Sequence, residues 1–399
     1  MNVSTRGRKA QASPIRRLAP YADAAVKAGA KVYYLNIGQP DVPTPEIVMD
    51  RIRSYPGTYV PYSPSGGIPE FVEAMSRYYA QHGIEAAPAE ILTTVGGSEA
   101  LQFAFWALFE PGDEVLLFEP FYTNYATMAL VAGVSVKALP CDGRAGYHLP
   151  PLEAIEREVG PKTRGVLLCA PSNPTGTAYT ASEIDAICDL ARRRDLWIIT
   201  DEAYREFIYD GAKHESPMTR KAAAERTVLV DSISKRLNLC GARVGTLVTK
   251  NAAVREACLK FAQARLSPPT VGQWAASVID KVPASYTQGV VAEYRKRRDL
   301  VLDGLSRIPG TFSRKPEGAF YLRAELPVSD AEEFVIWMLK EYRKDGATVM
   351  VAPGDGFYAT PGRGKNEIRF AYVLECGALE KAMDVLKGAL EAYPVKAAR

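Results

Sequence analysis

The chain has 399 residues, of which 47% are hydrophobic and 24% charged, and its formal net charge is +3. This composition is typical of a soluble globular protein with one large and one smaller domain, and so small a net charge does not indicate binding to nucleic acid or to an anionic membrane. No apolar run approaches the length of about 18 residues that spans a membrane, so we expect no membrane span. The cysteines form no Cys-x-x-Cys pair, so we expect neither a metal site nor a disulfide framework. The basic N-terminus is not followed by an apolar stretch, so we expect no signal peptide and a cytoplasmic protein.

The first 90 residues are expected to form short elements between polar loops. Residues 15–30 have helical spacing, and the apolar run over 32–41 is interrupted by glycine and proline. Residues 59–67 are too rich in Pro, Gly and Ser for a helix or a central strand. An amphipathic helix is predicted over 69–81, because a proline stands at its start and apolar residues recur at helical spacing.

Residues 91–230 predict strands that alternate with helices. Apolar runs indicate strands at 91–95, 114–118, 134–138, 165–169, 196–200 and 227–230. One helix follows the first of these strands, and another starts at the capping box Thr180-x-x-Glu183. Apolar strands separated by helices indicate an α/β fold with a mostly parallel central sheet flanked by helices.

Four polar or small residues follow strands of this predicted sheet, namely Gly97, Asn173, Asp201 and Lys235. Ligands of open α/β sheets bind at the carboxyl ends of the strands, so we expect these residues to meet at one site. The glycine-rich turn that opens a helix around Gly97 would offer free backbone N–H groups to a phosphate.

Lys235 is the most informative of these residues. It follows two small hydroxyl residues, Ser232 and Ser234, just after an apolar run, and Arg243 follows one loop later. A lysine is costly to bury unless it is paired or used chemically, for example in a Schiff base with an aldehyde cofactor. The hydroxyls and Arg243 would then suit a phosphate on that cofactor. The alternative is a solvated lysine on a surface loop.

The C-terminal part predicts a smaller α/β unit. Helices are expected over 271–303, near 330–345 and up to about 393, with strands at 348–351 and 367–371. The charged run 295–299 is interpreted as a solvated helix face, and His82, His148 and His214 as solvated surface residues. The predicted domains are an N-terminal arm with part of the small domain (1–45), a large domain (46–285) and a small C-terminal domain (286–399).

Taken together, these motifs resemble those of the class I and II aminotransferases, which are pyridoxal 5'-phosphate (PLP) enzymes of fold type I. The resemblance extends over nearly the whole chain and is closest to bacterial aspartate and aromatic aminotransferases. It rests on Asn36-Ile37-Gly38-Gln39-Pro40-Asp41, Tyr62-Ser63-Pro64-Ser65-Gly66-Gly67, Gly96-Gly97-Ser98-Glu99, Pro120-Phe121-Tyr122, Asn173-Pro174-Thr175-Gly176, Asp201-Glu202-Ala203-Tyr204, Ser232-Ile233-Ser234-Lys235 with Arg243, and Arg369.

The resemblance implies catalytic roles for particular residues. Lys235 would hold PLP as a Schiff base and act as general base and acid, and Asp201 would keep the pyridine nitrogen protonated. Asn173 and Tyr204 would hydrogen-bond the phenolic oxygen of the ring, and Tyr122 would stack on the ring face.

The resemblance also implies binding roles. The phosphate would be held by Gly97, Ser98, Glu99, Ser232, Ser234 and Arg243, with Tyr62 reaching the phosphate of the neighbouring subunit in a homodimer with shared sites. The substrate carboxylate would be bound by Arg369, Gly38 and Asn173.

The activity implied is ping-pong transamination from an L-amino acid, aspartate or aromatic, to a 2-oxo acid such as 2-oxoglutarate. A PLP-dependent C–S lyase or a specialised biosynthetic PLP enzyme on the same fold remains an alternative, because the motifs do not separate reprotonation of the substrate carbanion from elimination. A PLP-binding transcription regulator is set aside, since only about 30 residues precede the first motif, too few for a DNA-binding domain.

Overall fold

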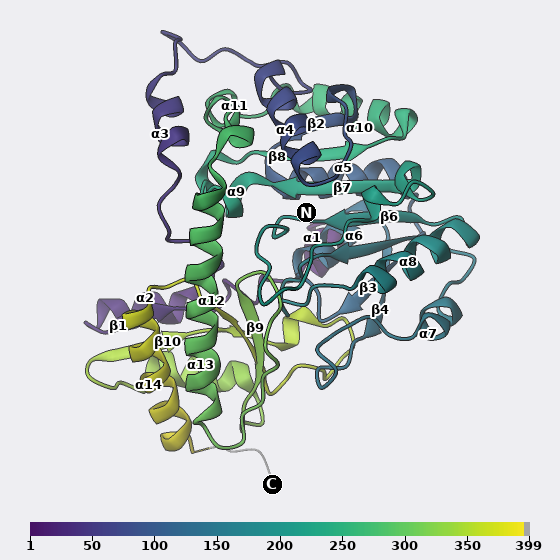
Figure 1. The fold of residues 1–399 in the computed structure, drawn as a ribbon. Helices are drawn as coiled ribbons and strands as arrows, with labels where there is room; N and C mark the ends of the chain where they lie inside the picture. The colour runs from purple at the N-terminus through teal and green to yellow at the C-terminus, as the bar shows by residue number, and fades with distance from the viewer. Residues whose placement is uncertain (395–399) are drawn as a thin grey trace.

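A seven-stranded sheet forms the centre of the larger part of the molecule in the computed structural model, which describes residues 1–394 (Figure 1). Its strand order is β2-β8-β7-β6-β5-β3-β4. The strands are β2 (Ile91–Thr94), β3 (Glu114–Glu119), β4 (Ser135–Pro140), β5 (Thr163–Cys169), β6 (Trp197–Asp201), β7 (Thr227–Ser232) and β8 (Gly245–Thr249). The pairs from β7 to β4 are parallel, and β8 is antiparallel to both of its neighbours. All strands except β8 therefore run in one direction, and their carboxyl ends share one edge, which confirms the predicted fold class.

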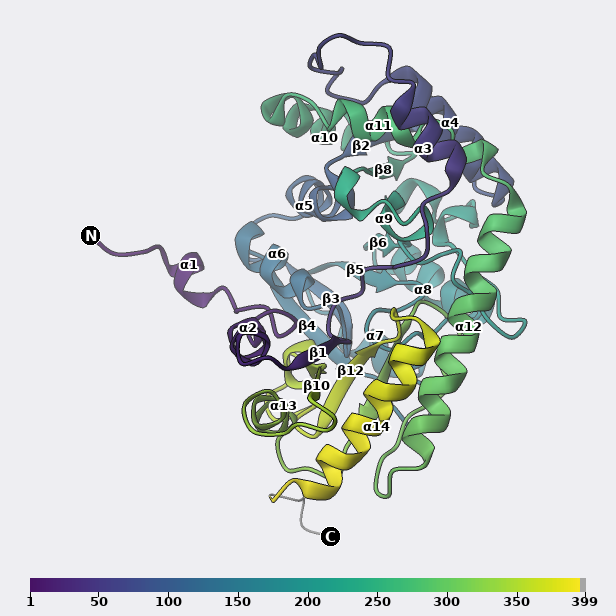
Figure 2. The ribbon, with the colours of Figure 1, turned by 90° about the vertical axis from the view of Figure 1, so that its left-hand side faces the viewer.

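Helices bury both faces of this sheet. On one face, α5 (Gly96–Leu108), α6 (Asn124–Ala132) and α10 (Ala252–Arg265) share a core with Leu117 and Ile199. On the other face, α8 (Ala181–Arg193) shares a core with Leu116 and Ile198. Successive strand residues point to opposite faces, so burial on both sides explains the continuous apolar runs of the sequence. The helices α3 (Glu46–Arg53), α4 (Pro69–Gln81), α7 (Leu152–Arg157) and α11 (Thr270–Ala276) complete the covering layers (Figure 2).

The smaller part combines chain segments from both ends of the sequence. An antiparallel sheet contains β11 (Ala352–Pro353), β12 (Glu367–Ala371) and β9 (Tyr321–Glu325), and β1 (Lys31–Tyr34) pairs in parallel with β10 (Ala347–Met350). The flanking helices are α2 (Ala19–Lys27), α12 (Ala284–Ser306), α13 (Ala331–Lys340) and α14 (Cys376–Ala392). Leu18 and Leu35 lie in one core with residues such as Phe320 and Leu386. The domain boundaries stated above stay a prediction.

The N-terminal segment differs from its predicted form. A short helix, α1 (Thr5–Lys9), precedes α2, and α2 begins only at Ala19 rather than near residue 15. The reason is Pro20, which fits the first turn of a helix but would break a helix interior. Residues 14–18 form turns instead.

The charged run 295–299 is only in part the solvated face that was predicted, because Arg295, Lys296 and Asp299 are exposed and the other two residues are buried. Arg297 and Arg298 are 4% and 0% exposed. Arg298 pairs with Asp210 at 2.7 Å, and Arg297 pairs with Glu293 at 2.7 Å. Buried arginines need such partners, and one of them comes from a distant part of the chain that no local pattern reveals.

Two of the three histidines are also bound rather than solvated. His214 Nε2 lies 2.8 Å from the Glu202 carboxylate, and His148 Nδ1 lies 3.0 Å from that of Glu183. His82 is exposed, as predicted. Within residues 1–394, every helix is too short or too polar to cross a lipid bilayer.

Candidate active site

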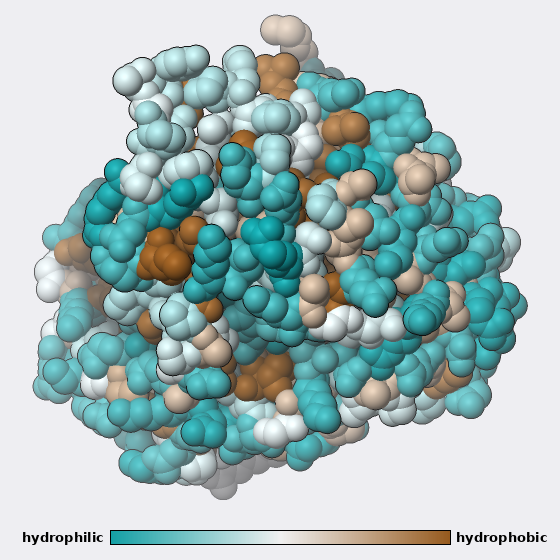
Figure 3. Space-filling model, turned by 45° about the horizontal axis from the view of Figure 1, so that its top comes forward, coloured by the Kyte–Doolittle hydropathy of each residue, from teal (hydrophilic) through white to brown (hydrophobic). Residues whose placement is uncertain are grey.

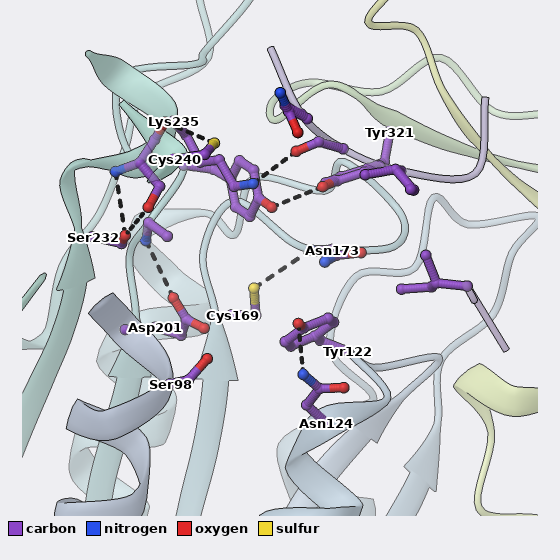
Figure 4. A pocket seen from close by; sticks show the side chains of 18 of the residues that line it. Ser98, Tyr122, Asn124, Cys169, Asn173, Asp201, Ser232, Lys235, Cys240 and Tyr321 are labelled. Atoms are coloured by element: carbon purple, nitrogen blue, oxygen red, sulfur yellow. Dashed lines mark hydrogen bonds between the residues drawn. The ribbon is translucent and has the colours of Figure 1, made fainter. Parts of the chain in front are cut away.

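A cavity of about 710 Å³ lies at the carboxyl edge of the large sheet and is lined by both parts of the molecule and by the N-terminal segment (Figure 4). It brings together all the predicted site residues except Glu99 and Tyr62. These residues are Gly38, Gly97, Ser98, Tyr122, Asn173, Asp201, Tyr204, Ser232, Ser234, Lys235, Arg243 and Arg369.

Lys235 lies in α9 (Ile233–Arg236), the single turn of helix that follows β7. Ser232 caps this turn, because its Oγ accepts a hydrogen bond from the backbone N–H of Ser234 at 3.2 Å. Lys235 Nζ donates to the carbonyl oxygen of Gly38 at 2.7 Å. Burial lowers the pKa of Lys235, and the charge of Arg369 adds to this effect. A lowered pKa increases the fraction of neutral amine, which is the nucleophilic form.

Asp201 is the last residue of β6 and faces the same cavity (Figure 4). Tyr125 donates its hydroxyl to Asp201 Oδ2 at 2.7 Å, and the backbone N–H of Ala203 donates to Oδ1 at 3.2 Å. Burial nevertheless raises the pKa of Asp201 to about 6. A protonated nitrogen beside this carboxylate would favour its charged form, so the position suits a cationic ring.

The N-terminus of α5 and Arg243 together form a site for an anion. Gly97 and Ser98 lie in the first turn of α5, where backbone N–H groups have no intrahelical partner. Gly96 has φ +70°, and a Cβ there would lie 2.6 Å from Arg243 Nη2. Arg243 thus sits at the positive end of a helix dipole, and among residues 1–394 no carboxylate forms an ion pair with it. Two positive groups held together in this way are stabilised by an anion between them.

Arg369 is a buried cation with no carboxylate partner among the described residues. Its side chain lies on β12 and is 1% exposed as a residue. Nη1 donates to Asn173 Oδ1 at 2.9 Å, Nη2 donates to the carbonyl of Asn36 at 2.5 Å, and Nε has no hydrogen-bond partner. Burial lowers its pKa. A carboxylate that entered the cavity would satisfy the free donor and the charge together.

The two predicted ring-contacting tyrosines are held by hydrogen bonds. Tyr122 accepts a hydrogen bond from Asn124 Nδ2 at 2.8 Å, and the hydroxyls of Tyr204 and Tyr321 lie 2.9 Å apart (Figure 4). Tyr321 also explains the glycine at position 38, where a Cβ would lie 1.7 Å from its hydroxyl oxygen. Only a glycine leaves room for this contact.

Two predicted residues lie outside the cavity lining. The carboxylate of Glu99 pairs with Arg265 Nε at 3.1 Å and accepts from the backbone N–H of Val95 at 2.8 Å, so only the backbone of Glu99 can serve an anion at α5. Tyr62 is 80% exposed, in the loop between α3 and α4 at the top of Figure 1. In the isolated chain it does not contribute to the cavity.

Several residues that position the site were missed by sequence reasoning. Asn36 and Tyr125 hold Arg369 and Asp201, and Tyr321, Asn124 and Arg16 line the cavity. Asn36 belongs to the motif of residues 36–41 named in the sequence analysis, and its signal there is a polar residue that follows an apolar run. Tyr125 had no local signal, because its partner is 76 positions away.

Comparisons with known proteins agree with this geometry. The family model "Aminotransferase class I and II" matches residues 30–386. A probable aspartate/prephenate aminotransferase from Thermus aquaticus is 33% identical, over 94% of this chain and 98% of the relative. An aromatic-amino-acid aminotransferase from Thermococcus litoralis is 31% identical, over 90% of this chain and 91% of the relative. The structure of an aspartate aminotransferase from Thermus thermophilus with maleate superimposes with a TM-score of 0.88 at 28% identity, covering 98% of this chain and 100% of that one. The chain therefore belongs to the class I and II aminotransferases, a family of PLP-dependent transaminases of fold type I.

Proposed function

We propose that this transaminase binds PLP in the cavity through Lys235 and moves an amino group from L-aspartate or an aromatic L-amino acid to a 2-oxo acid such as 2-oxoglutarate. The observation that carries the proposal is the arrangement around one cavity of a buried amine, a buried carboxylate and two cations without carboxylate partners. The names of the relatives from Thermus aquaticus and Thermococcus litoralis support the two substrate classes. We further propose a cytoplasmic homodimer with shared sites.

The residues present fit PLP at each of its polar groups. The amine of Lys235 suits the aldehyde, which it would hold through a Schiff base, and Asp201 suits the ring nitrogen. The N–H groups at the start of α5, the hydroxyls of Ser232 and Ser234, and Arg243 suit the phosphate. Asn173 and Tyr204 are the candidates for the phenolic oxygen.

When bound, PLP supplies an aldehyde that takes up the substrate amine and a ring that stabilises negative charge at the substrate α-carbon. Arg369 would bind the substrate α-carboxylate and fix the orientation of the α-carbon. Lys235 Nζ would remove the proton from that carbon and return a proton during the reaction. Asp201 would hold the proton on the ring nitrogen. The amino acid and the 2-oxo acid would occupy the same cavity one after the other, which corresponds to a ping-pong kinetic mechanism.

A half-reaction screen tests this function. Purified protein loaded with PLP is mixed with single L-amino acids, and the cofactor absorbance is followed. We expect aspartate or an aromatic amino acid to convert the cofactor to its amine form, and 2-oxoglutarate to restore the starting spectrum. Lys235→Ala should lack the starting spectrum and turnover, because it removes the amine that holds the aldehyde. If the protein converts no amino acid, or if turnover does not need a keto acid, transamination as proposed here is wrong.

A further inference from the structure

A buried ionic cluster lies next to the turn that carries Lys235. Its centre is Asp231, the residue before the last in β7, which is 1% exposed. Two arginines contact its carboxylate: Arg236 Nη2 donates to Oδ1, and Arg205 Nη2 lies 3.5 Å from Oδ2. Both arginines are buried as well. The function proposed above gives none of these three residues a role.

Asp231 holds the turn α9 at both of its ends. Its Oδ1 accepts a hydrogen bond from the backbone N–H of Ser232, the N-cap of the turn, at 2.7 Å, and accepts another from Arg236, the last residue of the turn. The turn has only four residues, and a single helical turn is not stable alone, because it fixes several residues for one hydrogen bond. Lys235 lies between the two anchored residues, so the point from which its side chain enters the cavity depends on this carboxylate.

The other carboxylate oxygen ties this turn to the segment that follows Asp201. Tyr79 donates its hydroxyl to Asp231 Oδ2 at 3.0 Å. Arg205 Nη2, which lies near the same oxygen, also lies 2.8 Å from a carboxylate oxygen of Glu202, the residue after Asp201. Asp231 therefore connects, through one arginine, the turn that presents the amine to the segment that presents the Asp201 carboxylate to the same cavity (Figure 4).

The surroundings of Arg236 offer little that could replace Asp231. Arg236 pairs with one other carboxylate among residues 1–394, that of Glu206, whose Oε1 lies 3.9 Å from Arg236 Nε. Within the same part of the chain, Nε and Nη1 of both Arg236 and Arg205 are buried without a hydrogen-bond partner. A buried cation that loses its main partner is costly, because its desolvation is no longer compensated. Removal of the Asp231 charge would therefore favour a displaced position of Arg236 and of the turn that contains it.

We propose that Asp231 is a positioning residue, whose carboxylate holds α9 so that Lys235 Nζ meets the aldehyde of PLP and fixes this turn relative to Asp201. The inference rests on the proposed function, since it assumes that Lys235 holds the cofactor. Asp231 does not line the cavity, so it acts only through the elements that it holds. Burial is the main cause of the raised Asp201 pKa, and the negative charge of Asp231 adds to it, as expected for two carboxylates held near each other.

The test compares the binding of PLP and of pyridoxine 5'-phosphate, an alcohol that cannot form a Schiff base, to the cofactor-free protein. The phosphate and ring contacts are common to both compounds, so the ratio of their dissociation constants, measured by fluorescence titration, isolates the contribution of the Lys235 amine. Asp231→Asn keeps the size of the side chain and removes its charge, and should lower the preference for PLP about tenfold or more, because the amine no longer meets the aldehyde. Lys235→Ala sets the lower limit of the ratio. Asp210→Asn removes a carboxylate partner of the buried Arg298 in the smaller part and is the matched control, with an unaltered ratio.

A second variant keeps the test decisive if Asp231→Asn does not fold, which circular dichroism establishes. Arg236→Gln opens the same contact from its other end and should shift the ratio in the same direction, and its ratio then decides the outcome. The inference is overturned if the deciding variant keeps the wild-type ratio, even with weaker binding of both compounds, or if Asp210→Asn lowers the ratio as much. Borohydride reduction of the wild type loaded with PLP tests the proposed function separately. A pyridoxyl label on Lys235 upholds that function whatever the ratios show, whereas a label elsewhere, or none, refutes the function and this inference together.

Discussion

At the scale of single residues, the site contains a buried carboxylate that is costly to keep charged without a cation beside it. Asp201 has a pKa raised to about 6 by burial, while its neighbour Glu202 behaves in the opposite way. Burial also acts against the Glu202 charge, but His214 and Arg205 outweigh it and lower the Glu202 pKa to about 2. The two adjacent carboxylates therefore differ because Glu202 is paired with basic side chains of the chain itself, whereas Asp201 has no cationic partner among the described residues.

This difference predicts opposite effects of neutralising the two residues in the cofactor-free protein. The charged form of Asp201 is destabilising above the folded-state pKa of about 6, and the cost disappears as the pH falls towards the unfolded value near 4. Asp201→Asn should therefore raise the free energy of unfolding near pH 8, by at most about 3 kcal/mol, with a gain that shrinks in acid. Urea denaturation across this pH range measures the effect.

Glu202→Gln is the control for this experiment and should lose stability near neutral pH, because the ion pairs of Glu202 are present above its depressed pKa. In the loaded enzyme, Asp201→Asn should lose most of its turnover, since the ring nitrogen would no longer be held protonated. Near wild-type turnover in that variant, or a cofactor-free form less stable than the parent, would contradict the role given to Asp201.

At the scale of elements, the strand order explains why residues far apart in sequence meet. β5, β6 and β7 are neighbours, so Asn173, Asp201 and Lys235 lie at or just after adjacent strand ends. The parallel direction of these strands puts the three ends on one edge. Arg369 reaches the same cavity from β12 of the smaller part, so the cavity depends on how the two parts pack together.

His148 connects elements of the two parts and predicts a pH-dependent contribution to stability. Its Nδ1 lies 3.0 Å from Glu183 in the first turn of α8, and its Nε2 lies 3.6 Å from Glu317, just before β9. Hydrogen bonds that the charged imidazole donates to these two carboxylates raise the His148 pKa to about 10. The stabilisation should therefore be complete below the unfolded value near 6.5 and lost as the pH rises through about 10.

The measurement is unfolding of His148→Gln from pH 7 to pH 10. The variant should be less stable than the wild type by about 1 kcal/mol near pH 7, because the ion pairs are partly exposed, and the difference should vanish near pH 10. His82→Gln serves as control: partial desolvation of the ring, which packs against Tyr78, lowers the His82 pKa to about 4, so this residue is neutral from pH 7 to pH 10. A His148→Gln difference that does not depend on pH would exclude the ion pairs as its cause.

At the scale of the whole molecule, the exposed loop between α3 and α4 allows a test of the predicted homodimer. Tyr59, Val60 and Tyr62 are 73%, 60% and 80% exposed, and Thr270 Oγ1 holds the loop by donating to the Pro61 carbonyl at 2.9 Å. Figure 3 brings this end of the molecule forward and shows hydrophobic residues as separate patches among hydrophilic ones. Tyr62 does not line the cavity of its own chain, as expected if it reaches the site of a partner subunit in the predicted homodimer.

Hybrid dimers test this prediction. Tyr62→Phe should weaken PLP retention by about 1 kcal/mol, the contribution of one hydrogen bond. Mixed subunits of Lys235→Ala and Tyr62→Phe, assayed at a PLP concentration too low to load the Tyr62→Phe parent, would combine both lesions in one site and leave the other site intact. Activity should then rise above that of either parent, and the same mixture at low concentration should lose it as dimers dissociate. A monomer by light scattering, or no recovery after mixing, would refute the shared site.

Sequence alone determined the class of fold and the family, and it predicted the residues that we propose to carry cofactor chemistry. These features are local: strands buried on both faces leave continuous apolar runs, capped helices leave start signals such as Thr180 and Glu183, and the residues after strand ends leave motifs. The helix from Pro69 to Gln81 was predicted to the residue, because its proline and its apolar spacing both act within the element.

Only the tertiary structure decided which residues hold those motifs in place. The bonds from Arg369 to Asn36 and from Tyr125 to Asp201, and the burial of Arg298 beside Asp210, join positions far apart in the chain. The N-terminal segment is likewise held beside the cavity by Asn36, which donates to the Ile15 carbonyl and accepts from Arg369. Periodicity and capping are set by a few neighbouring residues, whereas these contacts depend on how complete elements pack, and for that reason no local pattern contained them.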